Sequence, residues 1–183
     1  MERQIVTTSA ACPARLVPTG DKITIPKGVF VTLTQSLGGT YTVIHQGNMA
    51  RISGEFGELI GQQNHLLEFP EQSEQAQASL ANVNYALETV YDPEIPVNVK
   101  DLGLIYSVEI KDNNVYVIMT LTSPGCGMGP VLIEEIKDRL SQAPHVEAVY
   151  VEITFEPPWS RDCLLYTSPS PRDATLSRMP SSA

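Results

Sequence analysis

The chain has 183 residues, of which 42% are hydrophobic and 18% are charged, a composition typical of a folded globular protein and not of a disordered or fibrous one. Its formal net charge is -9, with 12 Lys and Arg against 21 Asp and Glu. Because there is also no basic cluster, we expect no nucleic-acid partner.

The first 15 residues, MERQIVTTSAACPAR, contain no basic segment followed by a long apolar run, so they do not resemble a signal peptide. No window reaches the roughly 20 apolar residues that a membrane-spanning helix needs. Cys12, Cys126 and Cys163 are odd in number and widely spaced, unlike a secreted disulfide framework. We therefore expect a cytoplasmic protein with reduced thiols and no membrane partner. Cys12 lies in a stretch without a clear pattern, and we expect it to be incidental.

Residues 1–69 are expected to form a small β-rich domain. In KITIPKGVFVTLTQ, residues 22–35, apolar and polar side chains alternate with the period of two that is typical of a half-buried strand. Gly38 and Gly39 then predict a hairpin turn before a strand at 41–44.

Residues 70–78 are rich in Gln and Glu and predict a linker. Ser79 is a suitable N-cap for a helix whose apolar side chains recur at spacings of three and four. These apolar positions are Leu80, Val83, Leu87 and Val90. The helix is expected to end at Asp92, because Pro93 disfavours the helical conformation in the residue before it.

Two strands, at 102–110 and 115–121, are joined by an Asp- and Asn-rich turn and predict a hairpin. A second helix is expected to start near Pro130, since proline is favoured at the first helical position. The alternating segment VEAVYVEITF then predicts a final strand. The whole order predicts an α+β protein, a small all-β domain followed by an αββαβ two-layer domain at 79–162.

The segment TSPGCGMGP, residues 122–130, places Cys126 among three glycines between a strand and a helix. A phosphate-binding loop would need a Lys and a Ser or Thr where Pro130 and Val131 stand, so that site is excluded. The amino end of a helix favours a thiolate, and glycines leave its sulfur accessible to a large partner. Two interpretations stay open: a reactive or metal-binding thiol, or a buried small apolar side chain in a glycine turn.

The segment DPEIPVNVKD contains Asp92, Glu94 and Asp101. Their carboxylates have the chemistry of general acids and bases, but Asp92 before a proline and Asp101 are equally typical of turns. No catalytic constellation accompanies them, so we do not expect a conventional enzyme.

Three segments in this order resemble one known family: DPEIPVNVKDLGLIYSVEI at 92–110, VIMTLTSPGCGMGP at 117–130 and VEITFEPPW at 151–159. They are similar to the SufT and PaaD type of iron-sulfur assembly domain, and the additional β-rich amino-terminal half resembles SufT in particular. The resemblance spans about residues 1–162. The combination of DPEIP, DLGL and TxPGC is specific, whereas each motif alone would be weak.

The resemblance implies a set of site residues. The family's characteristic cysteine falls on Cys126, as a ligand of iron or of an iron-sulfur cluster, which agrees with the preference of such iron for soft thiolates. The other motif positions, in the acidic loop and the turn, fall on Asp92, Glu94, Asp101, Thr122, Pro124 and Gly125.

The resemblance also implies a role in iron-sulfur cluster assembly or maturation, as a carrier or targeting factor that acts with the cluster-building machinery and client apoproteins. A cluster usually takes four cysteine ligands, and Gly129 stands where related carriers of the Nfu type have a second cysteine. A cluster at Cys126 would therefore be transient and would need a homodimer or an outside thiol such as glutathione. Two other hypotheses stay open: a metal-free protein-interaction adaptor, and a cysteine-dependent enzyme with Cys126 as nucleophile.

The last segment, residues 163–183, is rich in Ser and Pro and has no helix or strand pattern, which predicts disorder. Its beginning, CLLYTSPSPRD, resembles the translation of a transposon-based sequencing adapter. SufT-like chains instead continue past EPPW into a further helical segment. We therefore expect an artefactual tail that replaces the native sequence after Asp162.

Overall fold

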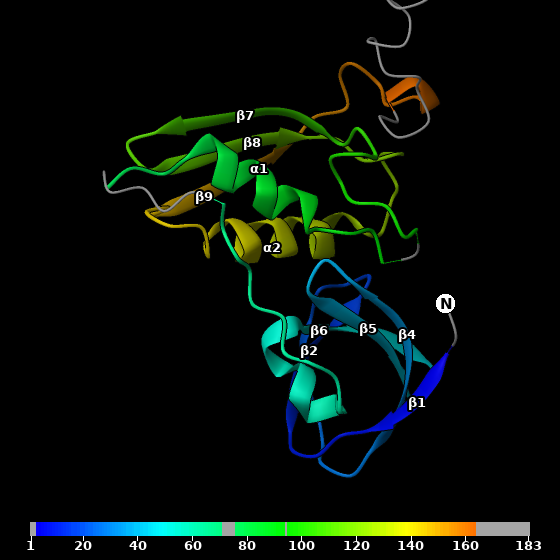
Figure 1. Ribbon diagram of the computed structural model, residues 1–183. Coiled ribbons are helices and arrows are strands. Elements are labelled where there is room, and N and C mark those ends of the chain that lie inside the picture. Colours follow the sequence, from blue (N-terminus) through cyan, green and yellow to red (C-terminus); the bar gives the residue numbers. More distant parts are fainter. Residues whose placement is uncertain (1–2, 71–75, 94, 164–183) are drawn as a thin grey trace, which may run out of the picture.

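The computed structural model describes residues 3–70, 76–93 and 95–163 of the chain. Within these residues the chain forms a six-stranded sheet and a three-stranded sheet, each with its own hydrophobic core (Figure 1). The predicted α+β class is confirmed. The artefactual tail stays a prediction, because 164–183 lie outside the described residues.

The first sheet and its short helix form a unit that we call the β domain. Its strands follow the order β1-β4-β5-β6-β2-β3, all neighbours are antiparallel, and the sheet curves around its core (Figure 1). Its elements are β1 (Gln4–Thr7), β2 (Cys12–Val17), β3 (Lys22–Ile25), β4 (Phe30–Leu37), β5 (Thr40–His45), β6 (Asn48–Ser53) and the 3₁₀ helix η1 (Gly54–Ile60).

The predicted alternation is confirmed in β4, where Val31 and Leu33 are buried and Phe30 is exposed. The stretch around Cys12, which showed no clear pattern in the sequence, is strand β2, and Cys12 is one of its fully buried core residues. This strand contains Pro13, and a proline inside a segment argues against a strand, so the sequence did not indicate β2. Pro13 is tolerated because β2 pairs only with β3 at that point, and its pairing with β6 begins later.

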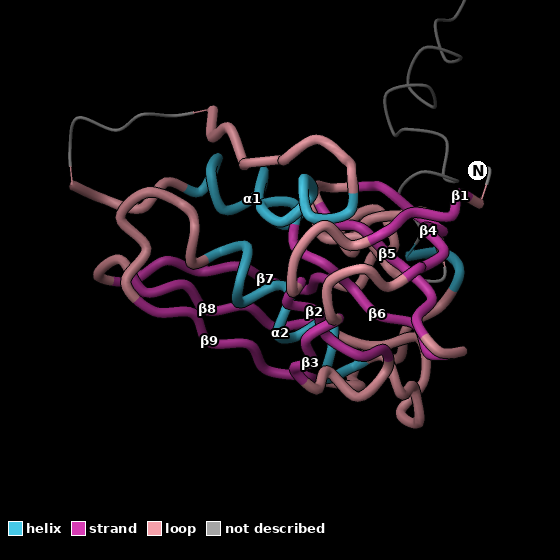
Figure 2. Tube along the Cα trace, turned by 90° about the horizontal axis from the view of Figure 1, so that it is seen from below, coloured by secondary structure: helices cyan, strands magenta, loops and turns pink. Residues whose placement is uncertain are grey.

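The second unit, which we call the α/β domain, packs two helices against one face of the three-stranded sheet. β7 and β8 form an antiparallel hairpin, and β9 runs parallel to β8 at the other edge (Figure 2). In β8, Val117 and Met119 face the core and Tyr116 and Ile118 lie on the exposed face. Its elements are α1 (Leu80–Glu88), β7 (Ile105–Lys111), β8 (Asn114–Met119), α2 (Gly129–Leu140), β9 (Ala148–Ile153) and the 3₁₀ helix η2 (Arg161–Cys163).

The first helix begins as predicted, because the Ser79 hydroxyl caps it. Its predicted end at Asp92 is wrong, since α1 stops at Glu88. The reason is a tertiary pairing: Tyr91 forms an isolated β-bridge with Asn98, which requires extended backbone where the sequence permitted a further helical turn.

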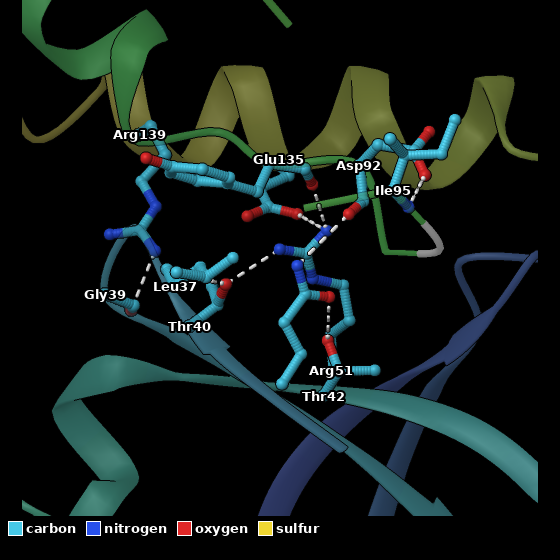
Figure 3. A network of polar contacts seen from close by, with 11 residues as sticks. Leu37, Gly39, Thr40, Thr42, Arg51, Asp92, Ile95, Glu135 and Arg139 are labelled. Carbon is cyan, nitrogen blue, oxygen red and sulfur yellow. Dashed lines mark hydrogen bonds and ion pairs between the residues drawn. The ribbon is translucent and has the colours of Figure 1, made fainter. Parts of the chain in front are cut away.

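The second helix starts at Gly129 with proline in its first turn, close to the predicted position. α2 lies between the three-stranded sheet and the β domain (Figure 1). Its residues Leu132 and Ile136 enter the core of the α/β domain, whereas Glu135 and Arg139 point toward the β domain (Figure 3). In the parts of the chain that the structure describes, no helix is long and apolar enough to cross a membrane.

Candidate functional site

The fold brings the motif segments together at one end of the strands of the three-stranded sheet. β8 and β9 are parallel, so their carboxyl ends lie at this end of the sheet, and the antiparallel β7 begins there (Figure 1). The cysteine turn (residues 122–130) follows β8, and the acidic loop (residues 92–101) precedes β7 through the DLGL turn. The Thr120 amide donates to the Leu104 carbonyl at 2.8 Å and joins these two connections.

Cys126 lies at the base of an exposed turn. The four residues before it, 122–125, are exposed, whereas Met128 and Gly129 are buried. Cys126 is half-buried at the margin of the core, and its amide donates to the Ser123 carbonyl at 3.1 Å. Cys126 therefore packs partly against the core and is partly accessible, so both interpretations of this thiol stay predictions.

Gly129 is a close-packing position. A Cβ atom there would lie 2.9 Å from Cδ1 of Leu121 and 4.0 Å from Cδ1 of Ile153. A second cysteine at this position would displace Leu121, so the glycine allows α2 to approach the sheet. Among the described residues, no group of three or more His, Cys, Asp or Glu side chains is placed to hold a metal ion. Cys126 is therefore not part of such a group within the described residues.

The acidic loop is organised by its own polar side chains. The Asp92 carboxylate accepts a hydrogen bond from the Ile95 amide at 2.9 Å. The Asn98 side chain accepts from the Asp101 amide at 2.9 Å and donates to the Asp101 carboxylate at 2.7 Å. Asp92 and Asp101 therefore both take part in turns. Glu94 lies outside the described residues.

The predicted strand at 102–110 begins too early, because β7 starts only at Ile105 and the DLGL segment, residues 101–104, forms a turn before it. Gly103 has φ +67, a backbone conformation that favours glycine. The Trp159 indole donates to the Leu102 carbonyl at 2.9 Å. The EPPW segment therefore packs directly on this turn.

The sequence interpretation missed a polar network that joins the two domains (Figure 3). Arg51 on β6 lies 2.8 Å from the Glu135 carboxylate on α2 and donates to the Tyr91 carbonyl at 2.6 Å. Arg139 donates to the Gly39 carbonyl at 2.7 Å. Burial raises the pKa of Glu135, although the guanidinium groups of Arg51 and Arg139 act to lower it. The network holds the residue before the acidic loop, α2 and the β domain in contact.

A cleft of about 650 Å³ opens beside this network between β2, β6 and α2. Arg15 and Asp138 both line this cleft and form an ion pair at 3.0 Å. The sequence carried one weak signal for this interface, a charged residue, Arg51, between apolar neighbours in the middle of a strand. Nothing in the sequence indicated its partner.

Part of the chain is similar to known proteins. Residues 80–153 match the family described as "Iron-sulfur cluster assembly protein". A "Fe-S protein maturation auxiliary factor" of Porphyromonas gingivalis is 48% identical over 79 residues, which cover 43% of this chain and 75% of that protein. The chain belongs to this family.

Two further members of the family match at similar levels. The "Fe-S protein maturation auxiliary factor YitW" of Bacillus subtilis is 43% identical over 82 residues, 44% of this chain and 80% of that protein. The "Fe-S protein maturation auxiliary factor SufT" of Staphylococcus aureus is 41% identical over 76 residues, 41% of this chain and 86% of that protein. The resemblance to a SufT-like protein is confirmed for the α/β domain, whereas the resemblance of the amino-terminal half stays a prediction.

Proposed function

We propose that this protein is a cytoplasmic iron-sulfur cluster assembly or maturation factor in which Cys126 contacts iron or the cluster during transfer. One observation carries the proposal: in a chain of this family, Cys126 is half-buried at the base of a turn whose preceding residues are exposed. A thiol in this position is held in place by its contact with the core and can still be reached by another protein.

The chemistry of a single thiol favours transfer over storage. A deprotonated cysteine is a soft ligand that suits iron-sulfur clusters, but such clusters usually need four ligands. Cys126 supplies one ligand, and the other three come from the donor, the client apoprotein or a second copy of this chain. The cluster is therefore cargo, passed between proteins and not kept.

The surface around Cys126 suits a protein partner. The cysteine turn offers exposed residues Thr122 and Pro124, and the acidic loop exposes Ile95 and Pro96. Protein–protein interfaces combine an apolar core with a polar rim, and these two segments expose groups of both kinds. We expect the partners to be the cluster-building machinery and client apoproteins, and we expect no catalytic turnover by this chain alone.

Anaerobic reconstitution tests the role of Cys126. The protein is incubated with ferrous iron, sulfide and a thiol reductant, then desalted and assayed for bound iron and for visible absorption by the cluster. We expect Cys126→Ala to lose most of both and Cys163→Ala to retain them. Equal iron and absorption in Cys126→Ala and the parent chain would rule out ligation by Cys126.

A metal-free adaptor role makes a different prediction in the same system. If the protein only joins other proteins, Cys126→Ala recovers the same partners in a pull-down and supports the same maturation of a client enzyme. Under our proposal the variant still binds partners through the surrounding surface, but client maturation falls.

A further inference from the structure

The β domain contacts the backbone just before the acidic loop through the turn between β4 and β5. Gly38 in this turn has φ +59, and a Cβ atom there would lie 1.9 Å from the Thr89 carbonyl oxygen. The neighbouring strand adds a polar contact, since the Gln35 amide group donates to the Asp92 carbonyl at 3.4 Å. Two backbones therefore meet closely at the end of α1.

Arg51 strengthens this contact from inside the interface. Its guanidinium binds the Tyr91 carbonyl, the Glu135 carboxylate and the Thr40 hydroxyl, the last at 2.7 Å (Figure 3). Its side chain is only 5% exposed. One buried residue of the β domain therefore connects the start of the acidic loop to α2, the helix that follows the cysteine turn.

A second contact reaches the cysteine turn itself. Pro18, in the turn between β2 and β3, lies 3.5 Å from where a Cβ atom would stand at Gly127. Gly20 in the same turn lies against the first turn of α2, near Val131. Val17 also packs on the hydrophobic core of the α/β domain.

The two contacts lie at opposite ends of one hydrogen-bonded sheet. Thr40 pairs with Ser53 at the end near the acidic loop, and Val17 pairs with Met49 at the other end. The ladder of strands fixes the distance between the two turns. A sheet held at both ends cannot shift along α2 without breaking one of the contacts.

We propose, on the basis of the function above, that the β domain fixes the position of the acidic loop relative to the cysteine turn, and that Arg51 is the positioning residue. Arg51 acts through the Tyr91 carbonyl and Glu135 and has no contact with Cys126. The β domain thus keeps the Cys126 surface in one arrangement for its protein partner.

A matched pair of glycine variants tests this positioning. Gly38→Ala and Gly47→Ala both place a side chain at positive φ in a hairpin turn, +59 and +81, but nothing lies within 4 Å of a Cβ atom at Gly47. The two variants share the backbone strain and differ in the contact with the α/β domain. Arg51→Ala and Arg15→Ala form a second pair, since Arg15 also spans the interface but binds only α2.

The readouts need no iron, so they are independent of cluster transfer. Hydrogen exchange is followed at 89–99 and 122–131, the alkylation rate at Cys126, and the indole N–H resonance at Trp159. We expect Gly38→Ala and Arg51→Ala to raise exchange in both segments about tenfold or more, the factor that one hydrogen bond to a charged group is worth. They also move the indole resonance and change the alkylation rate.

Gly47→Ala and Arg15→Ala are expected to leave these three readouts near those of the parent chain. Near-ultraviolet circular dichroism tests whether each variant is folded. If Gly38→Ala fails to fold, the comparison of Arg51→Ala with Arg15→Ala tests the proposal. Unchanged exchange at 122–131 in a folded Arg51→Ala would overturn the proposal. Failure of the iron reconstitution would leave this result intact, because it concerns geometry alone.

Discussion

Arg51 and Glu135 form a buried ion pair between the two domains, with 2.8 Å between Nη1 and Oε2 and side chains only 5% and 10% exposed. Neither charge reaches bulk water. Each is stabilised by the other and by a few neutral groups, such as the Tyr91 carbonyl on the arginine side. The pair therefore makes the interface sensitive to the loss of either partner.

Arg51→Ala is expected to destabilise the protein strongly. The change leaves Glu135 buried without its counter-charge, and breaking a buried pair in this way costs about 3–5 kcal/mol of unfolding free energy. Urea denaturation measures the loss. Lys100→Ala is the control, because its pair with Glu88 is more exposed and should contribute about 0–1 kcal/mol. Equal losses in the two variants would contradict a buried ionic contact.

The stability of the protein should depend on pH through Glu135. Its pKa is raised by burial first and by Asp138 in part, while Arg51, Arg139 and Arg15 lower it. A raised pKa in the folded state means that folding favours the protonated form. This contribution is complete below the ordinary glutamate pKa of about 4.3 and is lost as pH rises through the raised value.

Glu135→Gln removes this titration while keeping the shape of the side chain. The unfolding free energy of the parent chain, minus that of the variant, should therefore fall as pH rises from about 4. Urea titrations at a series of pH values measure this difference. A difference that rises with pH would contradict a raised pKa, because it would mean that the pairing with Arg51 outweighs burial and lowers the pKa of Glu135.

The sequence predicted those parts of the fold that depend on local rules. The alternation in β4, the cap at Ser79 and the proline at the start of α2 each involve a few adjacent residues, and the structure confirms them. The end of α1 was wrong because Tyr91 pairs with Asn98, and that pairing is a tertiary contact. The motif order also identified the family correctly.

The contacts between the domains could not be predicted. Arg51 and Glu135 lie on elements far apart in the chain, and each also fits a solvent-exposed position in its own segment. Gly38 was predicted as a hairpin residue, but its contact with the Thr89 carbonyl depends on how the domains meet. The roles of Cys126, Asp92 and the other motif residues stay predictions.

The cysteines should differ in reactivity. Burial raises the pKa of Cys12 to about 11, and its side chain is fully buried, so at pH 8 only about one thiol in a thousand is deprotonated. Iodoacetamide should therefore label Cys126 well before Cys12 in the folded protein, as followed by mass spectrometry of peptides. In concentrated urea both should react. Fast labelling of Cys12 under native conditions would mean that the β domain opens readily.

Gly129 should resist even a small side chain. Gly129→Ala places a methyl group 2.9 Å from Cδ1 of Leu121, and overpacking of this kind costs about 1–3 kcal/mol. Gly125→Ala, on the same turn with nothing within 4 Å, is the matched control and should change stability by less than about 0.5 kcal/mol.

A double variant separates the cost of this overpacking from the change in helix propensity that Gly129→Ala also brings. Leu121→Val removes the clashing atom, so it should destabilise the parent chain but recover part of the loss in Gly129→Ala, a favourable coupling measured by a double-mutant cycle. Strictly additive losses would mean that Leu121 does not exclude a side chain. A favourable coupling would mean that contact with Leu121 is what makes a side chain at position 129 costly.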